Sequence, residues 1–187
     1  MRLLLVRHPQ PLIEQGVCYG SSDLAVNAEQ LAQTTSALAA SLAVALPHGM
    51  ALYTSPLQRC TQLAHHLAAA MDLAPAIPDP RLAELHFGRW ELQRWDDIAR
   101  DEIDAWAADM VHYRPGGGES VLQMAQRVAA FYQHWHAQQQ DAIVICHAGT
   151  IRLLQACQRG LAPAAMALEA AQQAHHIAYG STLLLQT

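Results

Sequence analysis

Two histidines in this chain each follow directly on a short run of apolar residues. Leu3–Val6 leads into Arg7 and His8, and Ala142–Cys146 leads into His147. Unbroken apolar runs of this length are typical of strands that are buried on both faces of a parallel sheet. Because the carboxyl ends of parallel strands meet at one edge, where α/β sheets bind their ligands, we expect both imidazoles at one site.

The residues that follow each histidine direct the backbone in different ways. Pro9 disfavours a helical conformation at His8, so we expect the chain to leave the first strand extended. Gly149 is expected to let the backbone turn tightly after His147, into a helix whose free N–H groups face an anion. The second histidine therefore marks a candidate anion-binding turn.

Another cation is expected at the same edge. Met50–Tyr53 is typical of a second strand, and Ser55-Pro56 predicts a helix start, with serine as the N-cap and proline as the first helical residue. Arg59 then falls in the first turn of this helix, near the carboxyl end of the strand. The spacing thus brings a guanidinium close to the two histidines.

Two imidazoles beside two guanidiniums suit the chemistry of phosphoryl transfer. A neutral imidazole is a competent nucleophile at phosphorus, and arginines can hold the equatorial oxygens of the phosphoryl group. A carboxylic acid can protonate the departing oxygen, and cations fixed by the protein make a metal ion unnecessary. The residues alone leave this acid open among Asp23, Glu84, Glu91 and Glu119.

The elements that must hold these residues alternate between strand and helix. Strands are expected at 3–6, 50–53, 76–77, 142–146 and 181–186. Helices are expected at 27–46, from Ser55 onward, and at 95–110, 121–138, 150–160 and 163–173. In 187 residues this alternation predicts one domain with an α/β fold, a three-layer α/β/α sandwich around a mostly parallel central sheet.

The composition restricts the possible functions. The chain has 16 acidic and 11 basic residues and a net charge of −5, which argues against a nucleic-acid-binding or anionic-membrane surface. All the basic residues are arginines, which excludes the lysine chemistry of P-loops and Schiff bases. The four cysteines lack metal-type spacing, and no segment approaches the ~20 apolar residues of a membrane span. We expect a cytoplasmic protein with reduced thiols and no signal peptide.

Four motifs along the chain occur together in one known family. They are Arg7-His8, Ser55-Pro56-Leu57-Gln58-Arg59, Glu84-Leu85-His86-Phe87-Gly88-Arg89-Trp90-Glu91 and His147-Ala148-Gly149. In this order they resemble the R-H, S-x-L-x-R, E-x-x-F-G-x-W-E and H-x-G motifs of the histidine phosphatase superfamily, in its phosphoglycerate mutase-like branch. The resemblance implies a phosphoglycerate mutase-like fold, with residues 1–187 as one histidine phosphatase domain and about 85–120 as a small cap over the site.

The resemblance also implies a role for each residue of the site. His8 is expected to be transiently phosphorylated, while Glu84 first protonates the leaving oxygen and then activates water. The residues expected to bind the substrate and its phosphoryl group are Arg7, Arg59, His147, Ala148, Gly149, Tyr19 and Gly20. No metal ion and no cofactor are implied. We interpret Glu91 as a structural hydrogen-bond acceptor in the same loop as Glu84.

Several positions depart from the family pattern. Pro9 replaces the usual glycine after the nucleophile, and Pro11 and Glu14 stand where many members have a threonine and an asparagine near the phosphate. Leu92 replaces a common glycine. Pro9 removes one N–H that could face the phosphate, but none of these changes removes a catalytic group.

Three short segments indicate the substrate. The stretches 18–23, 116–120 and 179–181 are similar to those of proteins assigned as α-ribazole phosphatases, which dephosphorylate α-ribazole 5′-phosphate during assembly of the cobalamin lower ligand. The chain also lacks the long insertion of phosphoglycerate mutases between the Glu84 segment and the His147 strand. A smaller cap favours hydrolysis over transfer between two substrate halves. We expect a monomer or homodimer that acts on a small phosphorylated metabolite.

Other interpretations remain open. One is a broad-specificity phosphatase of the same superfamily, acting on sugar phosphates, nucleotides or phosphohistidine, and another is a phosphoglycerate mutase. A third is a non-catalytic module that binds a phosphorylated ligand. A histidine metal site would have to draw on His65-His66, His134-x-His136 or His175-His176, whose members do not share a helical face. We interpret these as surface or partly packed residues.

The four tryptophans allow two interpretations. Trp90, Trp95, Trp106 and Trp135 could line a pocket for an aromatic base. Core packing is the usual fate of aromatic side chains at such positions, and it is the interpretation we adopt from the sequence.

Overall fold

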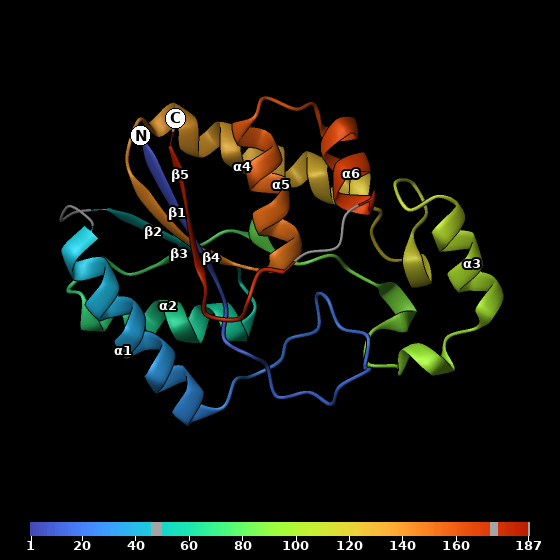
Figure 1. The fold of residues 1–187 in the computed structure, drawn as a ribbon, viewed down its shortest axis with the longest axis horizontal. Helices are drawn as coiled ribbons and strands as arrows, with labels where there is room; N and C mark the ends of the chain where they lie inside the picture. The colour runs from blue at the N-terminus through green and yellow to red at the C-terminus, as the bar shows by residue number, and fades with distance from the viewer. Residues whose placement is uncertain (46–49, 173–175, 187) are drawn as a thin grey trace.

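A computed structural model describes residues 1–45, 50–172 and 176–186 (Figure 1). Its centre is a five-stranded sheet in the order β3-β2-β4-β1-β5. The strands are β1 (Arg2–Arg7), β2 (Ala51–Thr54), β3 (Ile77–Pro78), β4 (Ala142–Cys146) and β5 (Thr182–Gln186). All neighbouring pairs are parallel except β1 and β5, so the mostly parallel sheet predicted from the sequence is confirmed.

The two histidine-bearing strands lie side by side at the centre of this sheet. Arg7 of β1 pairs with Cys146 of β4, so both strands end at the same level. All five residues of β4 are buried, as are the four central residues of β1. The burial of both faces explains why these segments are continuous apolar runs and do not alternate with polar residues.

Helices cover both faces of the sheet, which gives the three-layer sandwich that the sequence predicted. In Figure 1, α1 (Ala28–Ala45) and α2 (Gln58–Ala70) lie below the strands, and α4 (Val121–Gln138), α5 (Ala148–Gln158) and α6 (Pro163–Gln172) lie above them. Two separate apolar clusters result, one on each face. Consecutive strand residues alternate between these clusters, because side chains along a strand point to opposite faces.

The start of α2 differs from the sequence prediction. Its N-cap residue is Leu57, without a side-chain cap, and the helix begins at Gln58. Ser55 lies before the helix, and its buried hydroxyl contacts His147. The prediction of Ser55 as the N-cap was therefore wrong: its hydroxyl accepts the N–H of Leu57 at 3.4 Å, but the helix begins only after Leu57. Arg59 still falls in the first turn of α2.

Helix α4 has the bounds predicted from the sequence, 121–138, and its N-terminus carries a capping box. The Ser120 hydroxyl accepts the N–H of Gln123, and the Gln123 side chain accepts the N–H of Ser120.

For the helices predicted to end at residues 46 and 173, the last positions lie outside the described residues. The first of these, α1, begins where the Asn27 side chain accepts two N–H groups.

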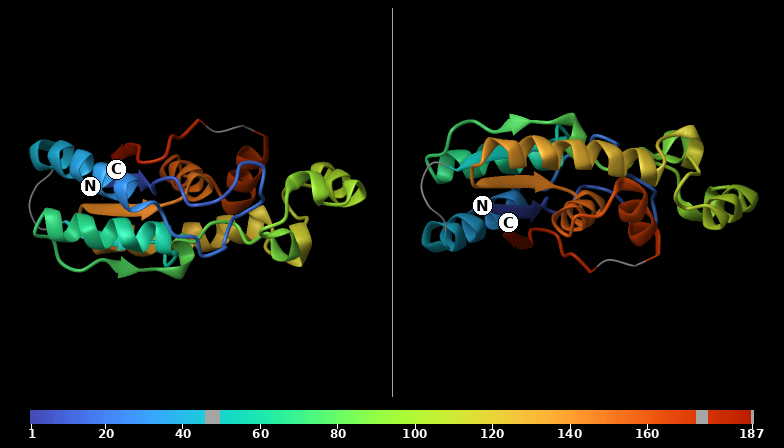
Figure 2. Two further views of the ribbon diagram at one scale, coloured as in Figure 1. Left: turned by 90° about the horizontal axis from the view of Figure 1, so that it is seen from below. Right: turned by 90° about the horizontal axis from the view of Figure 1, so that it is seen from above.

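Residues 85–120 project from one end of the sandwich, where Figure 2 shows α3 far from both termini. This segment contains η2 (Gly88–Trp90), η3 (Trp95–Asp97), α3 (Arg100–Ala108) and η4 (Pro115–Gly117). The single helix predicted over 95–110 is thus interrupted. The backbone is extended at Ile98 and Ala99, which buries the Ile98 side chain in an aromatic cluster with Trp90 and Trp95.

Two tight turns hold this segment against itself. Gly88 and Gly116 have φ values of +57° and +58°, and a Cβ at either position would collide with the backbone of the other turn. Backbone therefore packs on backbone between η2 and η4, which only glycine permits. In the part of the chain that the structure describes, no helix has the length and apolarity needed to cross a membrane.

Candidate active site

The two histidines predicted to share a sheet edge do meet there. The ring centroids of His8 and His147 are 4.9 Å apart, in an edge-to-face arrangement. The N–H of His8 also donates to the carbonyl of Cys146 at 3.1 Å, which extends the β1–β4 pairing by one residue. The sheet register therefore sets the distance between the rings.

The ring of His8 is held in one tautomer. Its Nδ1 lies 2.6 Å from the carbonyl oxygen of Pro9, and since a carbonyl only accepts, Nδ1 carries the proton. Nε2 then keeps its lone pair. Burial and the charges of Arg59 and Arg7 lower the pKa of His8 to about 3, although the bond to Pro9 opposes this shift. At neutral pH the ring is neutral and Nε2 can act as a nucleophile.

The ring of His147 has the opposite tautomer. Nε of Arg59 donates to its Nδ1 at 3.3 Å, which leaves Nε2–H to donate to the Ser55 hydroxyl at 2.8 Å. Burial holds the pKa of His147 well below its usual range, with His8 and Arg59 adding to the effect. Both nitrogens already have protein partners, so contact between His147 and a phosphoryl group requires one of these bonds to exchange.

Arg59 is a fully buried cation without a carboxylate partner among the described residues. Its guanidinium donates to the carbonyls of Gly20 and Ser22 as well as to His147. A buried charge is costly unless an opposite charge compensates it. This arrangement favours an anionic ligand at Arg59.

Arg7 is the second cation of the site. One of its Nη groups donates to the Ile177 carbonyl, and its Nε is buried without a hydrogen-bond partner among the described residues. The guanidinium carbon lies 3.8 Å from the ring centroid of Tyr179, a cation–π distance. The hydroxyl of Tyr179 is in turn 2.6 Å from that of Tyr19. Two tyrosines thus bridge the loop after β1 and the segment before β5.

Glu84 is the carboxylate that the structure brings to this site. Its Oε1 accepts the N–H of Leu85 and its Oε2 accepts the N–H of Gly149, both at 3.0 Å. The second bond comes from the first turn of α5, so the acceptor at that helix N-terminus is the carboxyl group of this side chain. Gly149 is helical and has no positive φ, so the tight turn predicted for it was wrong. The absence of a Cβ at Gly149 leaves the space that Oε1 of Glu84 occupies.

The backbone that carries Glu84 is fixed by Arg127 of α4. Its guanidinium donates to the carbonyls of Arg81, Ala83 and Glu84 at 2.7–3.2 Å, and it forms a two-point contact with the Glu119 carboxylate at 2.7 and 2.8 Å. Arg127 was not predicted from the sequence. Its partners are mostly backbone carbonyls, which every residue has, so no sequence motif marks Arg127.

Glu91 acts as the structural acceptor that the sequence analysis proposed. Its carboxylate accepts the N–H groups of Gly20, Ser21, Ser22 and Phe87 and the hydroxyls of both serines. Burial opposes ionisation of this carboxyl, but these hydrogen bonds outweigh it and lower the pKa of Glu91 to about 2. The loop whose carbonyls hold Arg59 is therefore fastened through Glu91.

A cavity of about 550 Å³ joins these groups. All but one of the nine residues assigned from the sequence line it: Arg7, His8, Tyr19, Arg59, Glu84, His147, Ala148 and Gly149. The exception is Gly20, whose N–H is used by Glu91 and whose carbonyl is used by Arg59. Pro11 and Glu14, two of the departures from the family pattern, are not among the lining residues. The lining also includes the apolar side chains of Phe87, Trp106 and Met110 and a third guanidinium, that of Arg152.

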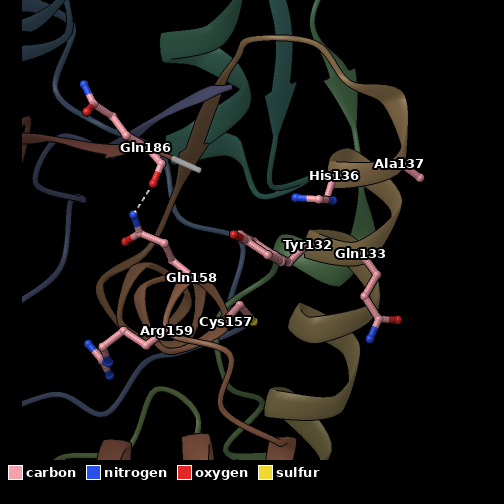
Figure 3. A pocket seen from close by; sticks show the side chains of 8 residues that line it. All are labelled: Tyr132, Gln133, His136, Ala137, Cys157, Gln158, Arg159 and Gln186. Atoms are coloured by element: carbon pink, nitrogen blue, oxygen red, sulfur yellow. Dashed lines mark hydrogen bonds between the residues drawn. The ribbon is translucent and has the colours of Figure 1, made fainter.

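A larger cavity of about 750 Å³ lies elsewhere, against α4 and α5 (Figure 3). Tyr132, His136, Gln158 and Arg159 are among its lining residues, and a Gln158–Gln186 hydrogen bond crosses one side. It contains none of the residues assigned from the sequence. Size therefore does not identify the candidate site, whereas the convergence of imidazoles, guanidiniums and a carboxylate does.

Histidines outside this cavity form no metal site in the described ranges. No group of three or more His, Cys, Asp or Glu side chains there is placed to hold a metal ion. The rings of His65 and His66 lie nearly perpendicular, with their centroids 5.9 Å apart. His175 lies outside the described residues.

Comparisons with known proteins agree with this geometry. The sequence model described as "Histidine phosphatase superfamily (branch 1)" matches residues 3–178. An adenosylcobalamin/alpha-ribazole phosphatase of Escherichia coli (strain K12) is 29% identical over 179 residues, which cover 89% of this chain and 83% of the relative. The crystal structure of the alpha-ribazole phosphatase from Shigella flexneri superposes with a TM-score of 0.83 at 25% identity, covering 100% of this chain and 90% of the other.

A further structural neighbour has the same fold. A mycobacterial glucosyl-3-phosphoglycerate phosphatase superposes with a TM-score of 0.78 at 24% identity, covering 99% of this chain and 92% of the other. At this identity the likeness concerns the arrangement of the sheet and helices alone.

Proposed function

The chain belongs to the histidine phosphatase superfamily, and we propose that it hydrolyses a small phosphomonoester through a phosphohistidine at His8. One observation carries the proposal. A neutral imidazole with a free Nε2 stands beside a buried guanidinium that has no carboxylate partner in the described part of the chain. A phosphoryl group supplies the missing negative charge and presents its phosphorus to that nitrogen.

In the first step, Arg7 and Arg59 bind the equatorial oxygens and Nε2 of His8 attacks phosphorus. The N–P bond forms as the P–O bond to the leaving group breaks, and protonated Glu84 gives its proton to the departing oxygen. In the second step, the ionised Glu84 takes a proton from water. The water oxygen bonds to phosphorus, the N–P bond breaks, and inorganic phosphate and neutral His8 are restored. Every step uses groups that line the cavity.

We propose α-ribazole 5′-phosphate as the substrate. Two observations support this choice: the relatives named above, and a cavity lined both by cations and by apolar side chains such as Phe87 and Met110. A phosphomonoester whose leaving group carries a planar heterocycle matches both kinds of lining. Residues 85–120 then act as a cap that contacts the leaving group, since Phe87, Trp106 and Met110 belong to it.

The test is the steady-state kcat/KM of the chelator-treated protein on a panel of phosphomonoesters. The panel contains α-ribazole 5′-phosphate, 3-phosphoglycerate, fructose 2,6-bisphosphate, nucleoside monophosphates and p-nitrophenyl phosphate. We expect metal-independent hydrolysis and the highest kcat/KM for α-ribazole 5′-phosphate. A higher value for sugar phosphates or nucleotides would reassign the substrate, and inactivity on the whole panel would leave a non-catalytic phosphate-binding module.

The four cysteines are consistent with the cytoplasmic location that we propose. Cys18, Cys60, Cys146 and Cys157 are all free and buried. Burial raises the pKa of each of these thiols, which keeps them protonated and unreactive. Free cysteines are typical of proteins in a reducing compartment such as the cytoplasm.

A further inference from the structure

Two buried side-chain donors have no hydrogen-bond partner among the described residues, Nε of Arg7 and Nε1 of Trp106. Both residues line the candidate catalytic cavity. Buried polar groups in folded proteins are nearly always paired, and an unpaired group at a binding site is one that a ligand can complete. Arg7 is one of the cations that the proposed mechanism assigns to the phosphoryl group, and Trp106 is one of the apolar lining residues.

Trp106 is held rigidly in this lining. Its ring lies nearly parallel to that of Trp95, at 8° and 6.1 Å between centroids, and the edges of Phe87 and Trp90 complete the packing. Trp90 and Trp135 donate their indole N–H groups to Glu102 and to the Gln140 carbonyl. Of the four tryptophans, Trp106 alone is among the residues that line the cavity.

The surroundings of Trp106 define the acceptor that suits it. The lining contributed by the cap and by α4 is apolar, namely Leu85, Phe87, Met110, Val121 and Met124. From α5 the cavity is lined by Leu153 and by the guanidinium of Arg152, which donates to the carbonyl of Ala170. A neutral acceptor on a planar apolar body fits both the indole N–H, which can only donate, and the apolar side chains around it.

We propose that Trp106 determines specificity by donating its indole N–H to a neutral ring nitrogen in the leaving group. The substrate class is then a phosphomonoester whose leaving group carries a planar, largely apolar heterocycle with an unprotonated nitrogen. The inference rests on the proposed function, because it requires a phosphomonoester in this cavity. Beyond that function, the proposal names the donor, the indole N–H of Trp106, and the acceptor, a ring nitrogen of the leaving group.

The test compares two substrates on two proteins. The substrates are α-ribazole 5′-phosphate and its indole counterpart, in which a C–H group replaces the free ring nitrogen. The proteins are the wild type and Trp106→Phe, which keeps an aromatic ring but lacks the N–H. We expect the wild type to prefer α-ribazole 5′-phosphate by about 10-fold in kcat/KM, and Trp106→Phe to lose that preference.

Trp95→Phe is the matched control. It removes an indole from the same aromatic cluster at a position that does not line the cavity, so the preference for the ring nitrogen should persist. Equal losses of kcat/KM on both substrates in Trp106→Phe would overturn the proposal and assign Trp106 to packing.

A measurement on the wild type keeps the proposal open to refutation if Trp106→Phe does not fold. The two nucleosides, α-ribazole and its indole counterpart, are compared as competitive inhibitors of p-nitrophenyl phosphate hydrolysis. We expect α-ribazole to bind about 10-fold more tightly, and equal inhibition would overturn the proposal. Failure of the proposed function has a different signature, because the wild type itself would then leave α-ribazole 5′-phosphate unhydrolysed.

Discussion

The N–H of Gly149 donates to Oε2 of Glu84 across 65 positions of the chain, and the same glycine leaves the space that Oε1 occupies. One residue in the first turn of α5 therefore both binds and makes room for the candidate acid. This contact links the β4–α5 connection, which carries His147, to the loop that carries Glu84. It therefore fixes the candidate acid relative to the connection that carries His147.

Gly149→Ala tests this relationship. Alanine normally stabilises a helix by about 0.5–1 kcal/mol relative to glycine, so propensity alone predicts a more stable protein. The added Cβ must instead displace the Glu84 carboxylate, and we expect kcat on alkyl phosphates to fall by about 100-fold. The measurement is kcat together with urea unfolding. Unchanged kcat would contradict the account.

Glu84→Gln tests the proton-donor role. The amide keeps the shape of the side chain but cannot protonate a leaving oxygen. For substrates with poor leaving groups we expect kcat/KM to fall by about 10²- to 10⁴-fold. Hydrolysis of p-nitrophenyl phosphate, whose leaving group needs little protonation, should lose far less in the phosphorylation step. Equal losses on both substrate types would rule out the acid role.

Substitutions of Arg127 test whether the catalytic role of Glu84 depends on the position of its backbone. Arg127→Gln removes the donors to the carbonyls of Ala83 and Glu84, so we expect kcat on poor leaving groups to fall by about 10- to 100-fold with little change in KM. Arg127→Lys keeps the charge but not the planar fork, and should recover only part of the rate. Full recovery by lysine would show that charge alone is required.

The buried histidines predict how stability depends on pH. His8 has a pKa of about 3 in the folded protein and the ordinary value of 6.5 when unfolded, so the unfolded chain binds the additional proton between these values. The free energy of unfolding must therefore decrease as pH falls from 6.5 towards 3. His8→Gln should reduce this slope by up to about 1.4 kcal/mol per pH unit, measured by urea unfolding at several pH values. Identical slopes would refute the assignment.

The sheet and its edge were predictable because their signals are local. The apolar runs before His8 and His147, and the distance from a strand end to Arg59, each follow from a few consecutive residues. The family motifs added Glu84. The three layers, the mostly parallel sheet and the meeting of the two rings were then confirmed by the structure.

Other features had no local signal. The roles of Ser55 and Gly149 depend on residues far away in sequence, His147 and Glu84, so both were assigned to local turn and cap geometry instead. Tyr179 reaches Arg7 only because β5 returns beside β1. Trp106 and Trp135 both have helical apolar spacing, and only the packing of α3 places one of them at the cavity.

The central claim is that His8 carries the phosphoryl group. The most direct test mixes Glu84→Gln with p-nitrophenyl phosphate, quenches at alkaline pH, where phosphohistidine survives, and maps the modified peptide by mass spectrometry. Without its base the variant should accumulate one phosphoryl group per chain on Nε2 of His8, with a matching burst of p-nitrophenol, and neither should occur when His8→Ala is added. A burst with the phosphoryl group on another residue, or turnover that persists without His8, would contradict the account.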